Sequence, residues 1–377
     1  MRTIKILHAA DFHFDTPFKE IGEKQSRINK EEIKEVFSEI INISKNKCVD
    51  ILLLAGDIFD NNTVNKQTLY FIEEKLKEIP DIKVFISPGN HDPLSKNSFY
   101  SFINWPNNVY IFKGNVEKVY LEDLDINVWG GAFNNKYVKT SMLKGIKADK
   151  EKMNIMVLHG EIANANDENE YNPINLREIE ESNMDYIALG HRHSFSGIKK
   201  IGSTFYAYSG CPQGRGFDEV GEKGVICGTV SKGVADLSFI RTSKRIYKEV
   251  KIDVTGCFTH EEIKGIIKES IREENRKENL YKIILSGEVS EEFNIDEEVL
   301  NNQLSSDFYF CKVIDKTRVK VNLEELSKGY SIKSIFASKI SNLMDATMEE
   351  EEKEILEKAL KLGLSCLAEE EVNLDDY

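Results

Sequence analysis

The N-terminal part of the chain alternates between apolar runs and amphipathic stretches. Apolar runs at 3–10, 49–57 and 82–90 predict buried strands, and the segments 27–47 and 65–78 repeat their hydrophobic residues with helical spacing. The resulting order, strand–helix–strand–helix–strand, is typical of an open α/β sheet. Such sheets carry their functional groups at the carboxyl ends of the strands.

Further strands are predicted along the middle of the chain. They lie at 109–112, 116–121, 125–130, 154–161 and 184–193. Residues 196–251 read as consecutive antiparallel strands with glycine-marked turns. Together these segments predict an α/β fold in which two sheets pack face to face with helices outside.

The pattern changes near residue 245. A compact α+β unit is predicted from a helix, a strand, a helix and a strand at 261–275, 280–289, 294–304 and 308–316. Two amphipathic helices follow. One carries a hydrophobic row formed by Ile332, Ile335, Phe336, Ile340 and Leu343, and the last aligns Leu356, Leu360, Leu364 and Leu367. The predicted domains are 1–245, 246–325 and 326–377.

Composition and cysteine spacing favour a soluble protein of the cytoplasm. The longest aliphatic run, residues 51–55, is far too short to cross a bilayer, and the start of the chain lacks the extended apolar segment of a signal peptide. The six cysteines are scattered and form no CxxC pair, which indicates reduced thiols rather than a disulfide framework. We therefore expect a cytoplasmic protein without membrane association.

The net charge of −14 is concentrated in the C-terminal third. Residues 251–377 contain 17 basic and 29 acidic side chains, a net charge of −12, which leaves −2 for residues 1–250. Because nucleic-acid binding depends on Lys and Arg contacts to phosphate, the overall acidity argues against it. The nearly neutral N-terminal part can still present a local basic face. The basic stretch 241–251 is one candidate, although a polar strand face explains it at least as well.

Five short stretches at the ends of predicted strands hold carboxylates, an amide and histidines. They read ADFHFD, AGDIFDNN, PGNHDP, LHGE and ALGHRHS, with the polar residues Asp11, His13, Asp57, Asp60, Asn90, His91, Asp92, His159, His191 and His193. Singly, each is explained by a capped turn or a satisfied polar pair. Together they would crowd at one sheet edge, and such a cluster requires divalent cations. Oxygen and nitrogen ligands without thiolate suit Mn, Fe, Mg or Zn, and about seven of them suit two ions.

The order D-x-H, GD, GNHD, H, GHxH resembles the signature of the calcineurin-like metallophosphoesterases. Three longer segments resemble the SbcD-type DNA-repair exonucleases: LHAADFHFDTPF, LLLAGDIFDNN and YSGCPQGRGFDEVGEKG (208–224). Within that group they look most like the bacterial subgroup that is encoded beside an SbcC-like ATPase. The likeness covers about residues 1–250, and for 251–377 it is one of layout only. It implies an αββα sandwich with a small C-terminal capping domain and tail helices.

The resemblance also implies a two-metal site, with Mn²⁺ as the expected ion. One metal would lie on Asp11, His13, Asp57 and His193, and the second on Asp57, Asn90, His159 and His191, so that Asp57 bridges them. His91 would stabilise the transition state or protonate the leaving oxygen. Asp92 would orient His91, and a turn or helix cap is the alternative role for this carboxylate.

Three other polar residues near these stretches receive weaker interpretations. Arg215 lies in the glycine-rich loop 208–224 and is a candidate phosphate contact; an ion pair with Asp218 or Glu219 is the alternative. Asp60 occupies a position where archaeal and eukaryotic relatives often carry a histidine. His8, inside the first strand, is expected to pack behind the site.

Three functions are consistent with these features. The leading hypothesis is a two-metal-dependent DNA exonuclease or endonuclease of DNA repair, a homodimer whose C-terminal helices dock an SbcC-like ATPase. The second is a small-molecule phosphodiesterase or phosphatase, for example on cyclic nucleotides, which the acidic composition favours. The third is an inactive scaffold for the ATPase; the complete set of motif residues argues against it.

Overall fold

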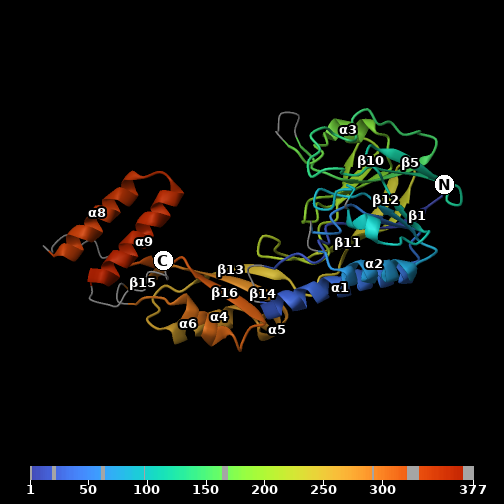
Figure 1. Ribbon diagram of the computed structural model, residues 1–377. Coiled ribbons are helices and arrows are strands. Elements are labelled where there is room, and N and C mark those ends of the chain that lie inside the picture. The colour runs from blue at the N-terminus through green and yellow to red at the C-terminus, as the bar shows by residue number, and fades with distance from the viewer. Residues whose placement is uncertain are drawn as a thin grey trace. The chain divides into compact units, whose positions relative to one another are not determined.

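The computed structural model describes residues 2–18, 23–60, 64–96, 98–163, 169–290, 293–320 and 331–367. The chain divides into two compact units, Met1–Lys244 and Arg245–Tyr377 (Figure 1). The first unit contains two six-stranded sheets, and the second contains a small sheet with helices and a helical hairpin.

The first sheet of unit Met1–Lys244 contains the predicted strand–helix alternation. Its strands follow the order β12-β11-β1-β2-β3-β4, and β1 to β4 run parallel to one another while β11 is antiparallel to β1. The bounds are β1 (Ile4–Ala9), β2 (Ile51–Leu54), β3 (Lys83–Ile86), β4 (Val109–Ile111), β11 (Gly224–Ser231) and β12 (Val234–Arg241). The connecting helices are α1 (Glu23–Asn46) and α2 (Lys66–Lys77). Strands β1, β2 and β3 therefore end at the same sheet edge.

The second sheet has the order β5-β6-β7-β8-β10-β9. Its strands are β5 (Glu117–Leu121), β6 (Ile126–Gly130), β7 (Met153–His159), β8 (Tyr186–Gly190), β9 (Lys199–Ile201) and β10 (Thr204–Tyr208). A 3₁₀ turn, η1 (Phe99–Phe102), precedes β4, and the short helix α3 (Leu176–Glu181) connects β7 to β8. Strands β6, β7, β8 and β10 run parallel, so their carboxyl ends also share one edge.

The main core of this unit lies between the two sheets. Alternate side chains of the facing strands form one cluster of fully buried residues that includes Ile6, Leu53, Phe85, Ile155 and Tyr186. A second cluster covers the other face of the second sheet, where Met156 and Leu158 of β7 pack with residues of α3. The two-sheet α/β sandwich predicted from the sequence is thus confirmed.

The prediction of one antiparallel run over 196–251 is wrong. Strand β10 pairs in parallel with β8, and β11 crosses to the first sheet, where it pairs with β1. Strand β13 (Tyr247–Asp253) belongs to the second unit and pairs in parallel with β14 (Leu280–Ser286). Alternating apolar residues and glycine turns identify strands, but they do not identify the partner of each strand, because parallel and antiparallel strands share the same side-chain period.

Unit Arg245–Tyr377 begins with a parallel sheet of order β13-β14-β16, in which β16 spans Phe310–Asp315. Its helices are α4 (His260–Ser270), α5 (Glu273–Glu278) and α6 (Glu297–Leu304), and β15 (Glu288–Val289) pairs with β17 (Arg318–Val319). The single helix predicted at 261–275 is interrupted because Ile271 is extended and buries its side chain. The predicted strand 280–289 breaks at Gly287, whose φ of +101° an L side chain rarely adopts.

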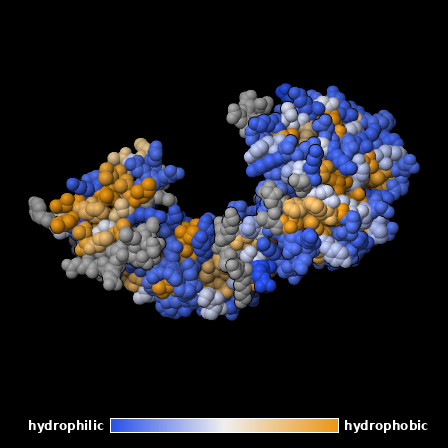
Figure 2. Space-filling model, in the orientation of Figure 1, coloured by the Kyte–Doolittle hydropathy of each residue, from blue (hydrophilic) through white to orange (hydrophobic). Residues whose placement is uncertain are grey.

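The chain continues into the hairpin of α8 (Ile332–Ala346) and α9 (Glu350–Leu367). The predicted hydrophobic row of α8 is divided between the hairpin interior and the surface. Phe336 and Ile340 pack against Leu360 and Leu364, whereas Ile332 is 74% exposed. Hydrophobic side chains are accordingly visible on the outside of the hairpin (Figure 2). No helix in the described part of the chain is long and apolar enough to cross a membrane.

Candidate metal centre

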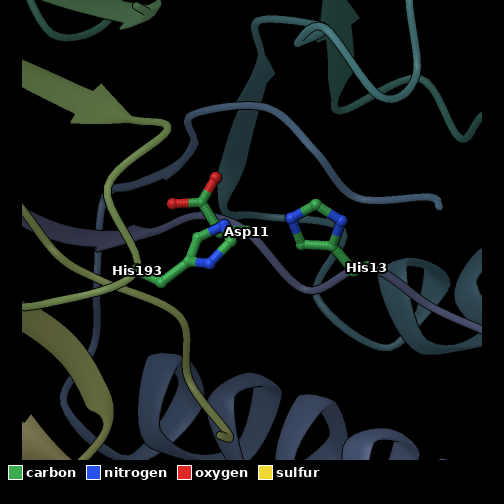
Figure 3. A group of neighbouring side chains, drawn as sticks. All are labelled: Asp11, His13 and His193. Carbon is green, nitrogen blue, oxygen red and sulfur yellow. The ribbon is translucent and has the colours of Figure 1, made fainter. Parts of the chain in front are cut away.

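Three polar side chains from two strand ends converge at one edge of the sandwich. Asp11 and His13 follow β1, and His193 follows β8. One ligand atom from each lies within 4.8 Å of the others (Figure 3). The carboxylate and the two imidazoles therefore present three of the four donors predicted for one metal.

A second group lies beside the first. Asp57 follows β2, His159 ends β7 and His191 follows β8, and their ligand atoms also lie within 4.8 Å of one another. The amide oxygen of Asn90, after β3, is 2.9 Å from Nε2 of His159 and 3.2 Å from Nδ1 of His191. The structure thus brings together all four residues predicted for the second metal.

Asp57 lies between the two groups. Its Oδ2 is 3.6 Å from Nε2 of His13 in the first group and 3.3 Å from Nε2 of His159 in the second. The carboxylate is 1% exposed. A single buried oxygen within reach of both groups is the arrangement that a bridging ligand requires.

The backbone is held in an unfavourable conformation at these positions. Asp11, His13, Asp57 and His191 have φ values of 57°, 47°, 49° and 106°, a region that non-glycine residues rarely occupy. The N–H of Asp11 donates to the carbonyl of Gly56, and that of His13 to the carbonyl of Asp57. Such strain persists where the surroundings impose it, and it gathers at functional sites.

The loops approach so closely that two of them need glycine. A Cβ atom at Gly190 would lie 1.7 Å from the carbonyl oxygen of Ala55, and one at Gly89 would lie 2.3 Å from Oδ1 of Asp57. Neither glycine stands out in the sequence as a ligand. Their role is to let the strand ends that carry the ligands meet.

The electrostatics of the cluster favour a cation. Burial opposes charge on Asp57, but His159, His13 and His91 nearby lower the pKa of its carboxyl below the usual range. Burial likewise opposes charge on His159, but Asp57 and Asp11 raise the pKa of its imidazole to about 9. Among the described residues, neither ring nitrogen of His13 has a hydrogen-bond partner, although the ring is fully buried. Buried polar atoms are normally satisfied, so the donor set fits divalent metal ions.

His91 lies at the open side of the cluster. Its Nδ1 is 3.0 Å from Oδ1 of Asp60, and its side chain is 37% exposed whereas that of Asp60 is 16% exposed. The hydrogen bond to Asp60 raises the pKa of His91 and outweighs the opposing effect of burial. Its ring centroid is 4.7 Å from that of His13. The imidazole is thus adjacent to the metal ligands and accessible from solvent.

Asp92 does not orient the His91 side chain as predicted. Oδ2 of Asp92 accepts hydrogen bonds from the N–H groups of Ile58 and Phe59 and from the hydroxyl of Tyr100, and Oδ1 accepts one from the N–H of Gly89. The residue is 4% exposed. Its carboxylate ties the loops after β2 and β3 together, which is the turn-capping alternative, and the carboxylate beside the His91 imidazole belongs to Asp60.

Arg215 forms an ion pair with Glu219. Its Nη2 lies 2.5 Å from Oε1 of Glu219, and Glu219 also contacts Nδ1 of His193 at 2.8 Å. Glu219 is 4% exposed. Burial opposes charge on Glu219 and on His193. The contacts with His193 and Arg215 nevertheless lower the pKa of Glu219, and the contacts with Glu219 and Asp11 raise the pKa of His193. A carboxylate on the outer nitrogen of a ligand histidine fixes its tautomer and ring orientation.

Sequence reasoning assigned no role to Glu161, which lies two residues after His159. Its Oε2 is 3.2 Å from Nε2 of His191, and its Oε1 accepts a hydrogen bond from Nε of Arg192. The pattern LHGE contained this residue, but nothing in it indicated a contact with another strand end.

His8 packs behind the cluster, 2.9 Å from the hydroxyl of Tyr186, and burial lowers its pKa to about 3.

The comparison with known families agrees with this geometry. The model for the calcineurin-like phosphoesterases matches residues 4–195, which contain both groups of candidate metal-binding side chains. The chain belongs to the calcineurin-like phosphoesterase family. Members of this family are metal-dependent phosphoesterases, so the protein is a hydrolase with a site for divalent metals.

Curated relatives extend the likeness beyond the matched region. An uncharacterized metallophosphoesterase of Bacillus subtilis, YhaO, is 25% identical over 94% of this chain and 96% of its own length. The DNA double-strand break repair protein Mre11 of Saccharolobus solfataricus is 26% identical over 76% of both chains. A subunit of the nuclease SbcCD of Staphylococcus epidermidis is 24% identical over 58% of this chain and 64% of its own.

Proposed function

We propose that the protein is a two-metal-dependent phosphodiesterase that cuts DNA. The observation that carries this proposal is the contrast between the ligands and His91. The metal-binding carboxylates and the ligands His13 and His159 are almost fully buried, while His91 next to them is more than one-third exposed. A buried metal cluster with one accessible imidazole is suited to chemistry on a substrate that approaches from solvent.

Two divalent cations bound by these residues would supply a hydroxide nucleophile and polarise the phosphate oxygens. The chain itself contributes His91. Since Asp60 holds Nδ1 of this imidazole and favours its protonated form, Nε2 can donate a hydrogen bond to the phosphate or a proton to the leaving oxygen. Glu161 and Glu219 hold the outer nitrogens of His191 and His193, so both ligand rings stay oriented when substrate binds.

Two considerations support DNA as the substrate. Two of the relatives are a DNA double-strand break repair protein and a component of a nuclease. The net negative charge is concentrated in 251–377, and unit Met1–Lys244, which holds the candidate metal-binding groups, is nearly neutral. Arg215 contributes less than the sequence predicted, because its guanidinium already pairs with Glu219.

The test compares the wild-type protein with His91→Asn on end-labelled linear duplex and single-stranded DNA. Each reaction is run with Mn²⁺, with Mg²⁺ and with EDTA. We expect shortening that requires a divalent metal and falls about 100-fold or more in the variant, since general acid–base groups contribute roughly 10²–10⁴-fold. The matched control is His260→Asn, which removes a histidine of the second unit. Equal loss in both variants, or cleavage that persists in EDTA, would overturn the proposal.

The second candidate is a small-molecule phosphodiesterase. The observation in its favour is the net charge of −14, which repels a polyanion more than a single nucleotide. The same enzyme preparations are therefore assayed on a cyclic nucleotide and on a chromogenic diester. Hydrolysis of these substrates with intact DNA selects this candidate.

We further propose an ATPase partner and a homodimer, both on the family likeness. One relative is named as a subunit of the nuclease SbcCD, and the hairpin α8–α9 exposes Ile335 and Ile355 at 52% and 67%. An SbcC-like ATPase that docks there should bind wild-type protein and fail to bind Ile355→Asp. Binding that survives this change would place the partner elsewhere. Light scattering on the purified protein distinguishes a dimer from a monomer.

A further inference from the structure

Two tyrosine rings lie next to each other at the rim of the metal centre. The ring of Tyr171 is 5.1 Å from that of His191, with planes inclined by 31°, and the ring of Tyr137 is 5.8 Å from that of Tyr171. Tyr137 is 45% exposed and Tyr171 is half-buried. Neither ring is part of the two hydrophobic clusters formed by described residues of the sandwich. Core packing therefore does not account for them.

The backbone beneath these rings is fixed to the metal centre. The carbonyl of Tyr171 accepts a hydrogen bond from the N–H of Glu161, and the side chain of Asn172 donates to the carbonyl of the ligand His159. Val138 forms an isolated β-bridge with Tyr171. The backbone next to Tyr137 is therefore joined to the backbone of Tyr171. The backbone that carries the two rings is thus fixed before any substrate binds, which reduces the entropy lost when a ligand contacts them.

We propose that Tyr137 and Tyr171 form a platform on which a nucleobase of the substrate stacks beside the scissile phosphate. This inference rests on the proposed phosphodiesterase function and adds its substrate class. Aromatic side chains bind single-stranded nucleic acid because every base offers a π-face. Because the Tyr171 ring lies 5.1 Å from that of His191, a base stacked on it would lie beside the metal centre. Nζ of Lys136, 5.4 Å from the centre of the Tyr137 ring, adds a cation for an adjacent phosphate.

The alternative is that Tyr171 only supports the ring of His191. The two roles differ in what they predict for substrates with and without a base. The test therefore uses thymidine 5′-(4-nitrophenyl phosphate), thymidine 3′-(4-nitrophenyl phosphate) and methyl 4-nitrophenyl phosphate. All three release the same leaving group, and only the first two carry a base. The measured quantity is the selectivity, the ratio of kcat/KM for a thymidine ester to kcat/KM for the methyl ester.

We expect Tyr137→Ala and Tyr171→Ala to lower this selectivity for at least one thymidine ester by about fivefold to 150-fold, mainly through KM, since stacking is a binding interaction. Tyr171→Phe keeps the ring and should retain the selectivity. The matched control is Tyr120→Ala in β5. Tyr120 is 44% exposed, but it pairs with Asn127, at the opposite end of the sheet from His159. Calorimetry of thymidine 5′-monophosphate binding, with methyl phosphate as reference, gives a second readout without turnover.

Three outcomes separate the inference from the proposed function. If selectivity and thymidine 5′-monophosphate binding fall in both alanine variants and not in the control, the platform is established. If activity on all esters falls in parallel while the selectivity stays constant, Tyr171 only supports His191 and the platform is refuted. If the wild-type protein hydrolyses none of the esters with Mn²⁺ bound, the phosphodiesterase function itself fails.

Discussion

Replacing Glu219 by alanine should destabilise the sandwich strongly. The Glu219 side chain is 3% exposed, and it pairs with Nη2 and Nε of Arg215 and with Nδ1 of His193. Its Oε2 also accepts a hydrogen bond from the N–H of Arg215. Alanine would leave the guanidinium, whose side chain is 15% exposed, without its carboxylate. Removing one partner of a buried ion pair costs about 3–5 kcal/mol.

That cost is a large fraction of the free energy of unfolding of a typical protein, which is ~5–15 kcal/mol. We expect urea unfolding, followed by circular dichroism in EDTA, to show a loss of about 3–5 kcal/mol for Glu219→Ala and a smaller loss for Glu219→Gln, which keeps the hydrogen-bonding atoms. The control is Glu222→Ala. Glu222 is 61% exposed and pairs with Arg241 at 3.8 Å, so its loss should cost less than about 1 kcal/mol. A cost below about 1 kcal/mol for Glu219→Ala would refute the reasoning.

Three further changes test other parts of the centre. Tyr100→Phe removes a hydroxyl that donates to the buried carboxylate of Asp92 at 2.7 Å, so unfolding in urea should show a loss of about 1–3 kcal/mol; no loss would mean that another donor replaces it. Gly190→Ala would force a Cβ atom to 1.7 Å from a carbonyl oxygen, so we expect insoluble or unfolded protein, and a normally folded variant would contradict the tight approach of the strand ends. Removing Mn²⁺ from a solution at about 100 times the dissociation constant should lower the free energy of unfolding by about 2.7 kcal/mol for each ion bound, and an unchanged melting temperature would argue against binding to the folded state.

The convergence of the candidate ligands could be predicted because each lies at the end of a strand that the hydrophobic pattern identifies. Asp11, Asp57 and Asn90 lie within four residues after parallel strands of one sheet; in the other, His159 ends β7 and His191 follows β8. Parallel strands end at a common edge, so these side chains are expected near one another. Strand direction therefore predicts that these residues share one edge, whereas the distances between them depend on the loops.

The residues that hold the ligands in place were harder to predict. Asp92 was assigned to its neighbour His91, but the Asp92 carboxylate faces the backbone of another loop, and Asp60 reaches His91 across 31 positions of sequence. Glu219 reaches His193 from a loop in the same way. Contacts between loops depend on the backbone conformation of single residues, such as the positive φ of Asp57. Hydrophobic periodicity does not predict these conformations.

The most direct test of the two-metal centre is a count of bound ions. The purified protein is dialysed to equilibrium with Mn²⁺, and metal per chain is measured by mass spectrometry for the wild type and for Asp57→Ala. We predict two ions per chain in the wild type and a loss of both in the variant, since Asp57 is within reach of both ligand groups. One ion or none in the wild-type protein, or two in Asp57→Ala, would contradict the bridged two-metal site.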